Sequence, residues 1–362
     1  MARLSPGSIF AGQFRVVQPL GRGGMGEVYV VEQASTGALR ALKLLLPHLA
    51  DEPGARDRFE REAKVAARVA SDHLVQVIAA GVDDESGAPW LAMELLEGES
   101  LAARVARAGP LPPAEARELF AQLGHALGAA HDAGVVHRDL KPENLHVGVR
   151  RRASERCSLK VLDFGLAKFV LEGESSRTGP MGTVAWMAPE QTERGSVGPP
   201  ADVWSVGLLA FWALVGQPYW RSAREASSVP VLMREILVDP IAPANERAAE
   251  LQGALPPGFD AWFARAVVRD PDARFGDGRR ACEALVALLP DDAGAVNLRA
   301  LLGVAPTEAS DAVRSAVKRA GIERTTRAAS RKRGVAATLL FVVVAAAFAL
   351  ATITWRRLAR DR

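Results

Sequence analysis

The first hundred residues contain several short runs in which apolar and polar positions alternate. Alternation covers residues 14–20, 27–32 and 40–44, and glycine-rich or turn-forming residues separate the runs. A period of two predicts half-buried strands, and the short connections predict an antiparallel meander. Strand-like runs follow at residues 74–78 and 90–95, with a stretch of helical composition at residues 59–69 before them.

From residue 97 onward the pattern is mainly helical. Residues 101–107 and 113–133 have helical composition, and helices return from residue 202 to about residue 289. The run at residues 203–215 is apolar on all sides but too short to cross a bilayer, so it predicts a buried central helix. The pattern therefore predicts an α+β protein with a small antiparallel lobe and a larger helical lobe.

Residues 335–354 differ from the rest of the chain because they carry no charge. At the helical rise this segment spans about 30 Å, which matches a hydrocarbon core. Basic residues flank both ends, with Trp355 at one of them. The segment predicts a transmembrane helix; the alternative, a hydrophobic helix packed on the protein, would be expected to have a polar face.

These patterns together predict the organisation of the chain. The expected parts are an N-terminal extension (1–13), a main domain (14–290, dividing into lobes at about 14–96 and 97–290), a linker (291–334), the membrane helix (335–354) and a short basic tail (355–362).

Composition excludes some classes of protein. Of the 362 residues, 49% are hydrophobic and 24% charged, so the chain can bury a sizeable core. A net charge of +3 is small for this length and argues against a nucleic-acid partner. Cys157 and Cys282 are too few and too isolated to form a disulfide framework or a zinc site.

Residues 137–144 read His-Arg-Asp-Leu-Lys-Pro-Glu-Asn and must form a loop, because Pro142 disfavours helical backbone before it. The loop places a carboxylate, an ammonium and an amide within eight residues. A carboxylate can orient a hydroxyl, a cation can bind a phosphate and an amide can bind a metal. These are the parts of a phosphoryl-transfer site.

Four further motifs accompany this loop. They are Gly-Arg-Gly-Gly-Met-Gly at 21–26, Asp-Phe-Gly at 163–165, Ala-Pro-Glu at 188–190 and Asp-Val-Trp at 202–204. The glycine motif also occurs in dinucleotide-binding folds, but there a helix follows it, whereas here a strand follows. In this order the motifs resemble those of the bacterial eukaryotic-like (Hanks-type) serine/threonine protein kinases. The resemblance covers about residues 14–289 and implies the two-lobed protein kinase fold. The transmembrane helix predicted at residues 335–354 would follow this domain.

The resemblance implies ATP and Mg²⁺ as cofactors and assigns catalytic roles. Asp139 would orient the substrate hydroxyl and accept its proton, and Lys141 would neutralise charge on the γ-phosphate. Lys43 would bind the α- and β-phosphates and pair with Glu62, although Glu60 is an alternative partner.

The resemblance also implies the surroundings of the nucleotide. Asn144 and Asp163 would bind the metal, since magnesium prefers hard oxygen ligands. The residues implied to surround ATP are Leu20, Gly21, Arg22, Gly23, Gly24, Met25, Gly26, Glu27, Val28, Ala41, Lys43, Met93, Glu94 and Leu96.

Other residues are implied to support the site. Glu190 should form an ion pair with Arg274, and Asp202 should hold the backbone of the 137–144 loop. Thr183 matches a threonine near the substrate pocket and is expected to contact Asp139.

The loop between residues 164 and 188 contains candidate phosphorylation sites. Thr178 is the first candidate, followed by Ser175 and Ser176, because a phosphate there could pair with Arg138. Two features depart from the family pattern: His146 stands at a usually apolar strand position, and residues 148–156 form a long basic turn.

The sequence therefore predicts an active serine/threonine protein kinase that phosphorylates proteins, including its own loop, and is anchored in the cell membrane. The expected partners are protein substrates, ATP and the lipid bilayer, with a homodimer as a further option. Because ATP is cytoplasmic, the kinase domain should face the cytoplasm and the tail the outside. Alternatives are a pseudokinase acting as a scaffold and, less favoured, a small-molecule phosphotransferase.

Overall fold

The computed structural model describes residues 4–23, 26–45, 69–83, 85–148, 157–163, 181–193, 195, 197–225 and 227–290. All of them belong to the first of two compact units, Met1–Gly303. The expected helix at residues 59–69, except Val69, and the expected membrane segment at 335–354 lie outside the described residues. Among the helices that are described, none combines the length and apolarity needed to cross a membrane.

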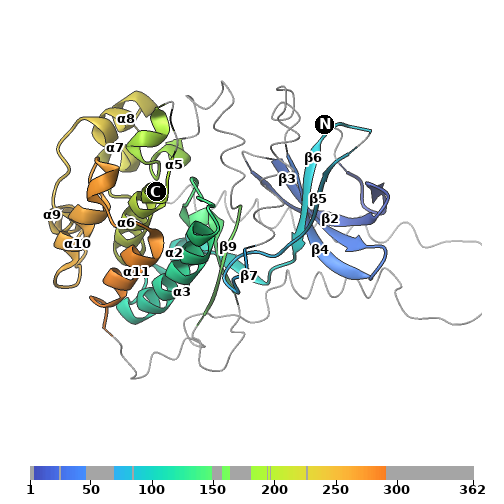
Figure 1. Ribbon diagram of the computed structural model, residues 1–362, viewed down its shortest axis with the longest axis horizontal. Helices are drawn as coiled ribbons and strands as arrows, with labels where there is room; N and C mark the ends of the chain where they lie inside the picture. Colours follow the sequence, from blue (N-terminus) through green and yellow to red (C-terminus); the bar gives the residue numbers. More distant parts are fainter. Residues whose placement is uncertain are drawn as a thin grey trace, which may run out of the picture. The chain divides into compact units, whose positions relative to one another are not determined.

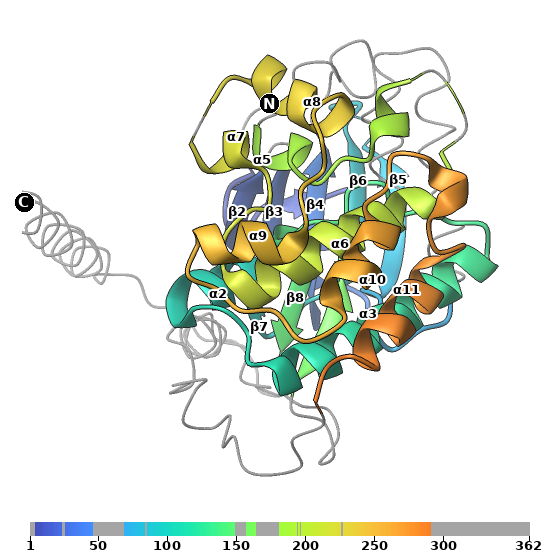
Figure 2. The same cartoon turned by 90° about the vertical axis from the view of Figure 1, so that its left-hand side faces the viewer.

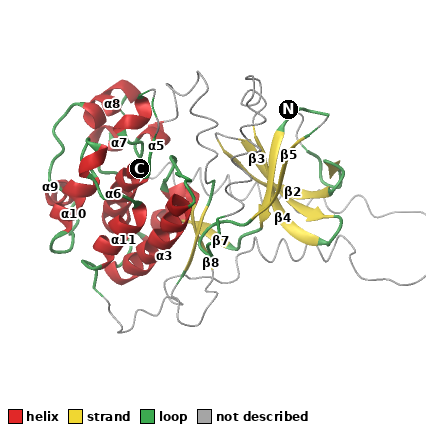
Figure 3. Cartoon of the chain, viewed as in Figure 1, coloured by secondary structure: helices red, strands yellow, loops and turns green. Residues whose placement is uncertain are grey.

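Six strands form one antiparallel sheet with the order β1-β2-β3-β4-β6-β5 (Figures 1 and 3). The strands are β1 (Ile9–Phe10), β2 (Phe14–Gly23), β3 (Gly26–Gln33), β4 (Ala38–Leu45), β5 (Val77–Val82) and β6 (Pro89–Glu94). The predicted meander of β2, β3 and β4 is confirmed. Strand β1 comes from the expected N-terminal extension, and Phe10 is buried there against the ring of Trp90.

Strand β4 is buried on both faces, and its alternation determines which way each side chain points. Leu42 and Leu44 enter one apolar cluster, whereas Ala41 and Leu45 enter another on the opposite face. Because side chains alternate along a strand, Lys43 shares the face of Ala41 and Leu45. The first cluster also contains Phe10, Phe14, Val16, Tyr29, Val31, Trp90 and Ala92, and the second also contains Leu91 and Met93.

Strand β5 begins later than the strand predicted at residues 74–78. The residues before it bond to a different strand, β9 (Ser158–Val161). The Val75 N–H donates to the Val161 carbonyl at 3.0 Å, and the Val161 N–H donates to the His73 carbonyl at 2.8 Å. This backbone pairing joins the six-stranded sheet to the part of the chain that follows it.

The second part of the unit consists of helices and a small sheet with the order β7-β8-β9. Its other elements are β7 (Gly98–Ser100), α2 (Leu101–Ala108), α3 (Pro113–Asp132), β8 (Leu145–Gly148), α5 (Met181–Val184), α6 (Pro200–Val215), α7 (Arg221–Arg224), α8 (Val229–Leu237), α9 (Ala244–Glu250), α10 (Phe259–Ala266) and α11 (Gly278–Val286). Short 3-10 turns lie at Pro142–Asn144, Pro189–Thr192 and Pro271–Ala273.

Helix α6 is the predicted central helix. It packs against α3, α10 and α11 (Figure 2), and every residue from Ala201 to Val215 is buried. A proline in its first turn suits a helix start, because the amide that proline lacks would have no partner there. Gly216 ends the helix in the left-handed conformation, and its N–H donates to the Trp212 carbonyl at 2.7 Å.

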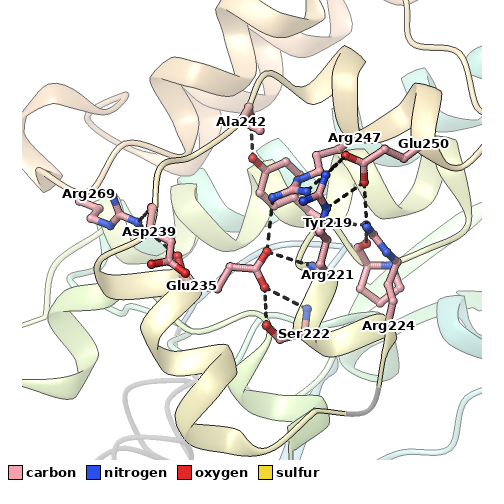
Figure 4. Close-up of polar contacts among 11 residues, drawn as sticks. Tyr219, Arg221, Ser222, Arg224, Glu235, Asp239, Ala242, Arg247, Glu250 and Arg269 are labelled. Carbon is pink, nitrogen blue, oxygen red and sulfur yellow. Dashed lines mark hydrogen bonds and ion pairs between the residues drawn. The ribbon is translucent and has the colours of Figure 1, made fainter.

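A buried carboxylate holds the short helices α7, α8 and α9 together (Figure 4). Glu235 of α8 accepts hydrogen bonds from the N–H groups of Arg221 and Ser222, both at 3.0 Å. The Ser222 hydroxyl donates to it at 2.6 Å, and Arg247 of α9 donates at 3.4 Å. The Arg247 guanidinium also lies over the ring of Tyr219. These five residues are called the Glu235 network below.

Candidate active site

Helix α6 holds the 137–144 loop through one buried carboxylate. Asp202, in the first turn of α6, accepts the N–H of His137 at 2.8 Å and the N–H of Arg138 at 2.9 Å. The predicted support of the loop backbone is thus confirmed. Arg138 has a φ of 66°, a strained conformation for a residue with a side chain, and the two bonds hold the loop in it.

His131 of α3 completes the surroundings of Asp202. Its Nδ1 accepts the N–H of Gly278 at 3.2 Å, so Nε2 carries the proton and donates to Asp202 at 2.8 Å. Burial opposes ionisation of Asp202. The hydrogen bonds donated by His131 and by the His137 N–H, together with favourable electrostatic interaction with both residues, outweigh this effect. The pKa of the Asp202 carboxyl therefore lies below its ordinary value of 3.8.

His137 connects this loop to the end of β9. Its Nδ1 accepts the N–H of Asp139 at 3.2 Å, so Nε2 carries the proton and donates to the Leu162 carbonyl at 2.8 Å. The Leu162 N–H donates to the Asn144 carbonyl at 2.8 Å. The loop and the residue before Asp163 are therefore held in register.

The loop orients Asp139 with two donors. Lys141 Nζ lies 3.0 and 2.8 Å from the two carboxylate oxygens of Asp139. Asn144 Nδ2 donates to the Asp139 carbonyl at 2.7 Å and to its side chain at 3.0 Å. Thr183 was expected to contact Asp139 but makes no hydrogen bond to it; Lys141 bridges the two and donates to the Thr183 hydroxyl at 3.1 Å.

Lys43 lies beside Asp163 across 120 positions of sequence, with 2.6 Å between Nζ and the carboxylate. The face of β4 that carries Lys43 therefore points toward the end of β9. Asp163 has a φ of 60°, a second strained conformation at the site. Glu62 and Glu60, the two expected partners of Lys43, lie outside the described residues.

The glycine motif forms the end of the β2–β3 hairpin. Residues 21–23 pair with residues 26–28, and residues 24 and 25 lie outside the described part of the chain. Gly26 has a φ of 153°, and a Cβ there would lie 1.8 Å from the carbonyl oxygen of Leu44. At this position glycine is required by the close approach of β4, whatever the hairpin binds.

The residues expected around the adenine come together only in part. Val28, Ala41 and Met93 share one apolar cluster on the face of the sheet that carries Lys43. Leu20 is 53% exposed on the hairpin. The Glu94 N–H donates to the Gln76 carbonyl at 3.0 Å, so this amide is already bonded within the protein.

The other residues expected around the nucleotide lie on the β2–β3 hairpin and just after β6. Arg22 and Glu27 face each other across the hairpin with 3.7 Å between charged atoms. Leu96 is partly buried just after β6. His146, the departure in β8, is partly buried and pairs with Lys160 of β9. Residues 149–156 and the candidate phosphorylation sites lie outside the described residues.

The predicted ion pair between Glu190 and Arg274 is confirmed. Two guanidinium nitrogens of Arg274 lie 2.7 and 2.8 Å from the two oxygens of Glu190. Arg274 also donates to the Pro200 carbonyl at the start of α6, at 2.8 Å. This forked geometry fixes the segment that ends at residue 190 on the central helix.

Sequence reasoning missed two residues that shape the site, His131 and Lys160. Lys160 Nζ donates to Glu94 at 2.6 Å and to the Leu74 carbonyl at 3.0 Å. A signal was present, because Lys160 is the one charged residue in the run Leu-Lys-Val-Leu that precedes Asp163. A charge inside a buried strand needs partners, and finding them requires the fold.

The donor atoms of this arrangement fit a divalent cation bound to a triphosphate. Asp163 offers a carboxylate, and Asn144, whose Nδ2 is bonded to Asp139, offers its Oδ1. Both are the hard oxygen ligands that Mg²⁺ takes together with phosphate oxygens. The ammonium of Lys43 lies next to Asp163, as binding of a polyanion requires.

Comparison with known proteins agrees with this two-lobed fold. The family model described as "Protein kinase domain" matches residues 14–285. The chain belongs to the protein kinase domain family.

Several named protein kinases are similar to this chain. Serine/threonine-protein kinase PknD of Mycobacterium tuberculosis is 36% identical over 73% of this chain and 38% of its own length. PknE of Mycobacterium bovis is 32% identical over 78% of this chain and 47% of its own. Serine/threonine-protein kinase pkn2 of Myxococcus xanthus is 38% identical over 59% and 26%. The chain thus matches less than half the length of these relatives.

A solved structure shows the same fold. The crystal structure of the Mycobacterium tuberculosis PknI kinase domain aligns with a TM-score of 0.61 and 28% identity. The alignment covers 79% of this chain and 99% of that one.

Proposed function

We propose that this protein is an ATP-dependent serine/threonine protein kinase. The observation that carries the proposal is the assembly of groups from distant segments. Lys43 of β4 contacts Asp163 at 2.6 Å, and Lys141 contacts Asp139 at 2.8 Å. Hydrogen bonds through His137 link the two pairs. The similarity to named serine/threonine kinases supports the choice of protein acceptor.

The chemistry would proceed in a single transfer step. The oxygen of a serine or threonine hydroxyl forms a bond to the γ-phosphorus while the bond from that phosphorus to the β,γ-bridging oxygen breaks, releasing ADP. Asp139, oriented by Lys141 and Asn144, orients the hydroxyl and accepts its proton. Lys141 also places its positive charge next to the transferred group.

The remaining residues would hold the nucleotide. Lys43 would bind the α- and β-phosphates, and Asn144 and Asp163 would hold Mg²⁺. Magnesium, when bound, neutralises phosphate charge during the transfer. A pseudokinase would be expected to lack at least one of Lys43, Asp139, Asn144 and Asp163, and all four are present.

The decisive test is phosphate transfer by the full chain with Mg²⁺ and labelled ATP, beside Asp139→Asn. The wild type should incorporate label into itself or a generic protein acceptor, and the variant should be slower by at least about 100-fold. Asp260→Asn is the matched control, because its carboxylate bonds Asn245 between α9 and α10, away from the site. Equal labelling by wild type and Asp139→Asn would favour the pseudokinase.

Regulation by phosphorylation is part of the proposal. Arg138 Nε is buried and has no hydrogen-bond partner among the described residues, so its N–H is free to donate to a phosphate carried by the 164–188 loop. Thr178 is the first candidate, then Ser175 and Ser176. Mass spectrometry of active protein should detect phosphate in this loop; its absence would remove this part of the proposal.

Membrane anchoring by residues 335–354 is the third part of the proposal. It rests on the uncharged length of the segment and its basic flanks. The kinase domain would face the cytoplasm. A chain lacking residues 335–354 should leave the membrane fraction while the full chain stays in it, and unchanged membrane association of the shortened chain would contradict the anchor.

A further inference from the structure

Lys160 is a buried cation that the proposed transfer step does not use. It is 5% exposed and lies in β9, three positions before Asp163. Its Nζ donates to Glu94 at 2.6 Å and to the carbonyl of Leu74 at 3.0 Å. A buried ammonium is stable only where partners replace its lost hydration. Lys160 therefore holds Glu94 and Leu74 close to β9.

Glu94 links this cation to the end of β6. The carboxylate oxygen that Lys160 contacts also accepts the N–H of Gln76 at 2.9 Å. The Glu94 N–H in turn donates to the Gln76 carbonyl at 3.0 Å. The last residue of β6 is thus fixed by its backbone and by its side chain. The resemblance to protein kinases implies that the backbone of residues 94–96, which begin at this point, binds the adenine edge.

The other end of the connection is the strand that leads to Asp163. Val161 exchanges backbone hydrogen bonds with His73 and Val75, at 2.8 and 3.0 Å. Strand β9 therefore cannot shift without moving the segment around Leu74. Lys160 adds the end of β6 to this connection, so that the adenine and metal ends of the site share one support.

We propose that Lys160 is a positioning residue for the nucleotide. Through Glu94 it sets the backbone of residues 94–96 relative to Asp163, so that the adenine edge and the phosphates bind in register. This inference rests on the proposed function and deepens it. It assigns the adenine end of the site to a side chain that acts through Glu94 and not by contact with ATP.

Adenosine is the probe that isolates this effect, because it has the adenine but no phosphates. Lys160→Met keeps a long unbranched side chain and removes both hydrogen bonds. We expect it to bind adenosine about tenfold more weakly, because a displaced 94–96 backbone would lose about one hydrogen bond to the adenine edge. The KM for ATP should rise by the same factor, while kcat stays within about twofold. Lys43→Met should instead weaken ATP binding and leave adenosine binding unchanged.

A second buried ion pair supplies the control for general loss of stability. Arg104 of α2 and Glu115 of α3 are buried and lie 2.9 Å apart. Arg104→Met should lower the thermal unfolding midpoint, as Lys160→Met does, without changing the Kd for adenosine. A change in adenosine affinity specific to Lys160→Met therefore reports positioning and not stability.

The route through Glu94 is tested with Glu94→Gln, measured in the full chain by calorimetric titration with adenosine. Glu94→Gln alone should bind adenosine more weakly than the wild type. The double variant, which combines Lys160→Met with Glu94→Gln, should bind adenosine no more weakly than Lys160→Met alone. Additive losses would overturn the route. If Lys160→Met does not fold, Glu94→Gln decides, because it keeps the shape of the side chain.

The inference is overturned if Lys160→Met and Glu94→Gln bind adenosine as tightly as the wild type. A failure of the proposed function would give a different result, in the wild-type chain itself. In that case the wild-type chain itself would neither bind ATP nor transfer phosphate, whatever residue stands at position 160.

Discussion

Two buried carboxylates in the helical part of the protein accept similar sets of hydrogen bonds but hold different segments of the chain in place. Asp202 accepts two backbone N–H groups and a histidine N–H, and Glu235 accepts two backbone N–H groups, a hydroxyl and a guanidinium. The donors to Asp202 include the backbone of the loop that carries Asp139. The donors to Glu235 come from α7 and α9 (Figure 4).

The comparison shows that burial and complete hydrogen bonding do not by themselves identify a functional residue. What differs is the segment that each carboxylate holds. Asp202 keeps Arg138 in a left-handed conformation one residue before Asp139. Glu235 closes a turn between short helices. We therefore expect substitutions at the two positions to separate activity from stability.

The largest effect should come from Asp202→Asn. The amide cannot accept three hydrogen bonds on the same two oxygens, so the loop backbone should shift and misplace Asp139. We expect kcat to fall by about 100-fold, more than the loss of folded protein explains. The measurement is kcat on protein shown to be folded by near-UV circular dichroism. Wild-type kcat in a folded Asp202→Asn variant would contradict this role.

Glu235→Gln is the matched change in the second network. An NH2 group replaces one carboxylate oxygen and the negative charge is lost. Arg247 therefore loses its charged partner in α8, and Ser222 loses part of its hydrogen bonding. We expect the free energy of unfolding to fall by about 2 kcal/mol, while kcat of the folded enzyme stays within about twofold. Urea unfolding gives the first quantity and initial rates the second. A loss of kcat equal to that of Asp202→Asn would remove the distinction.

Much of this arrangement could be predicted from sequence because it depends on local pattern. Alternation located β2, β3 and β4, and the uniformly apolar run located α6. The Asp202 and Glu190 contacts also followed from motifs. These features need only short-range periodicity or a known order of motifs.

The rest depends on contacts between distant segments. Leu74 and Val75 have the composition of a strand in the first sheet, but their backbone pairs with Val161 of another. Thr183 reaches Lys141 and not Asp139, which depends on a side-chain conformation. The partners of Lys160 lie 66 and 86 positions away. No local pattern encodes such distances, so only the folded chain reveals them.

The contributions of Asp202 and of the Glu235 network to stability should be lost at opposite ends of the pH scale. The contribution of Asp202 should be lost in acid. Its pKa is lowered in the folded protein, so its contribution is complete above the ordinary value of 3.8 and is lost as pH falls through the folded value. The stability gap between wild type and Asp202→Asn should be constant from pH 7 to about 4. Below that it should shrink by up to about 1.4 kcal/mol per pH unit.

Urea unfolding of the two proteins at a series of acidic pH values measures this gap. Asp260→Asn is again the control, since its exposed hydrogen bond is expected to contribute little at any pH. A gap that stays constant well below pH 3.8 would mean that Asp202 titrates no differently in the folded chain.

The smallest effect concerns Tyr219, which belongs to the Glu235 network and should make it alkali-labile. Burial raises the pKa of Tyr219 to about 12 from its ordinary 10.0, against the opposing influence of Arg247. The folded protein therefore keeps this proton while the unfolded chain loses it, so the contribution of Tyr219 is complete below pH 10 and declines as pH rises toward 12.

Tyr219→Phe removes the titrating group and the hydrogen bond to the Ala242 carbonyl, which is 2.6 Å long. At pH 7 it should lower the free energy of unfolding by only about 1 kcal/mol and leave kcat unchanged. Between pH 10 and 12 the wild type should lose stability faster than the variant, by up to about 1.4 kcal/mol per pH unit, so that the two urea midpoints converge and then cross. Parallel alkaline curves would show that the Tyr219 hydroxyl titrates normally. Because Asp202→Asn keeps Tyr219, its alkaline curve should run parallel to that of the wild type at a constant gap, and the gap should change only in acid.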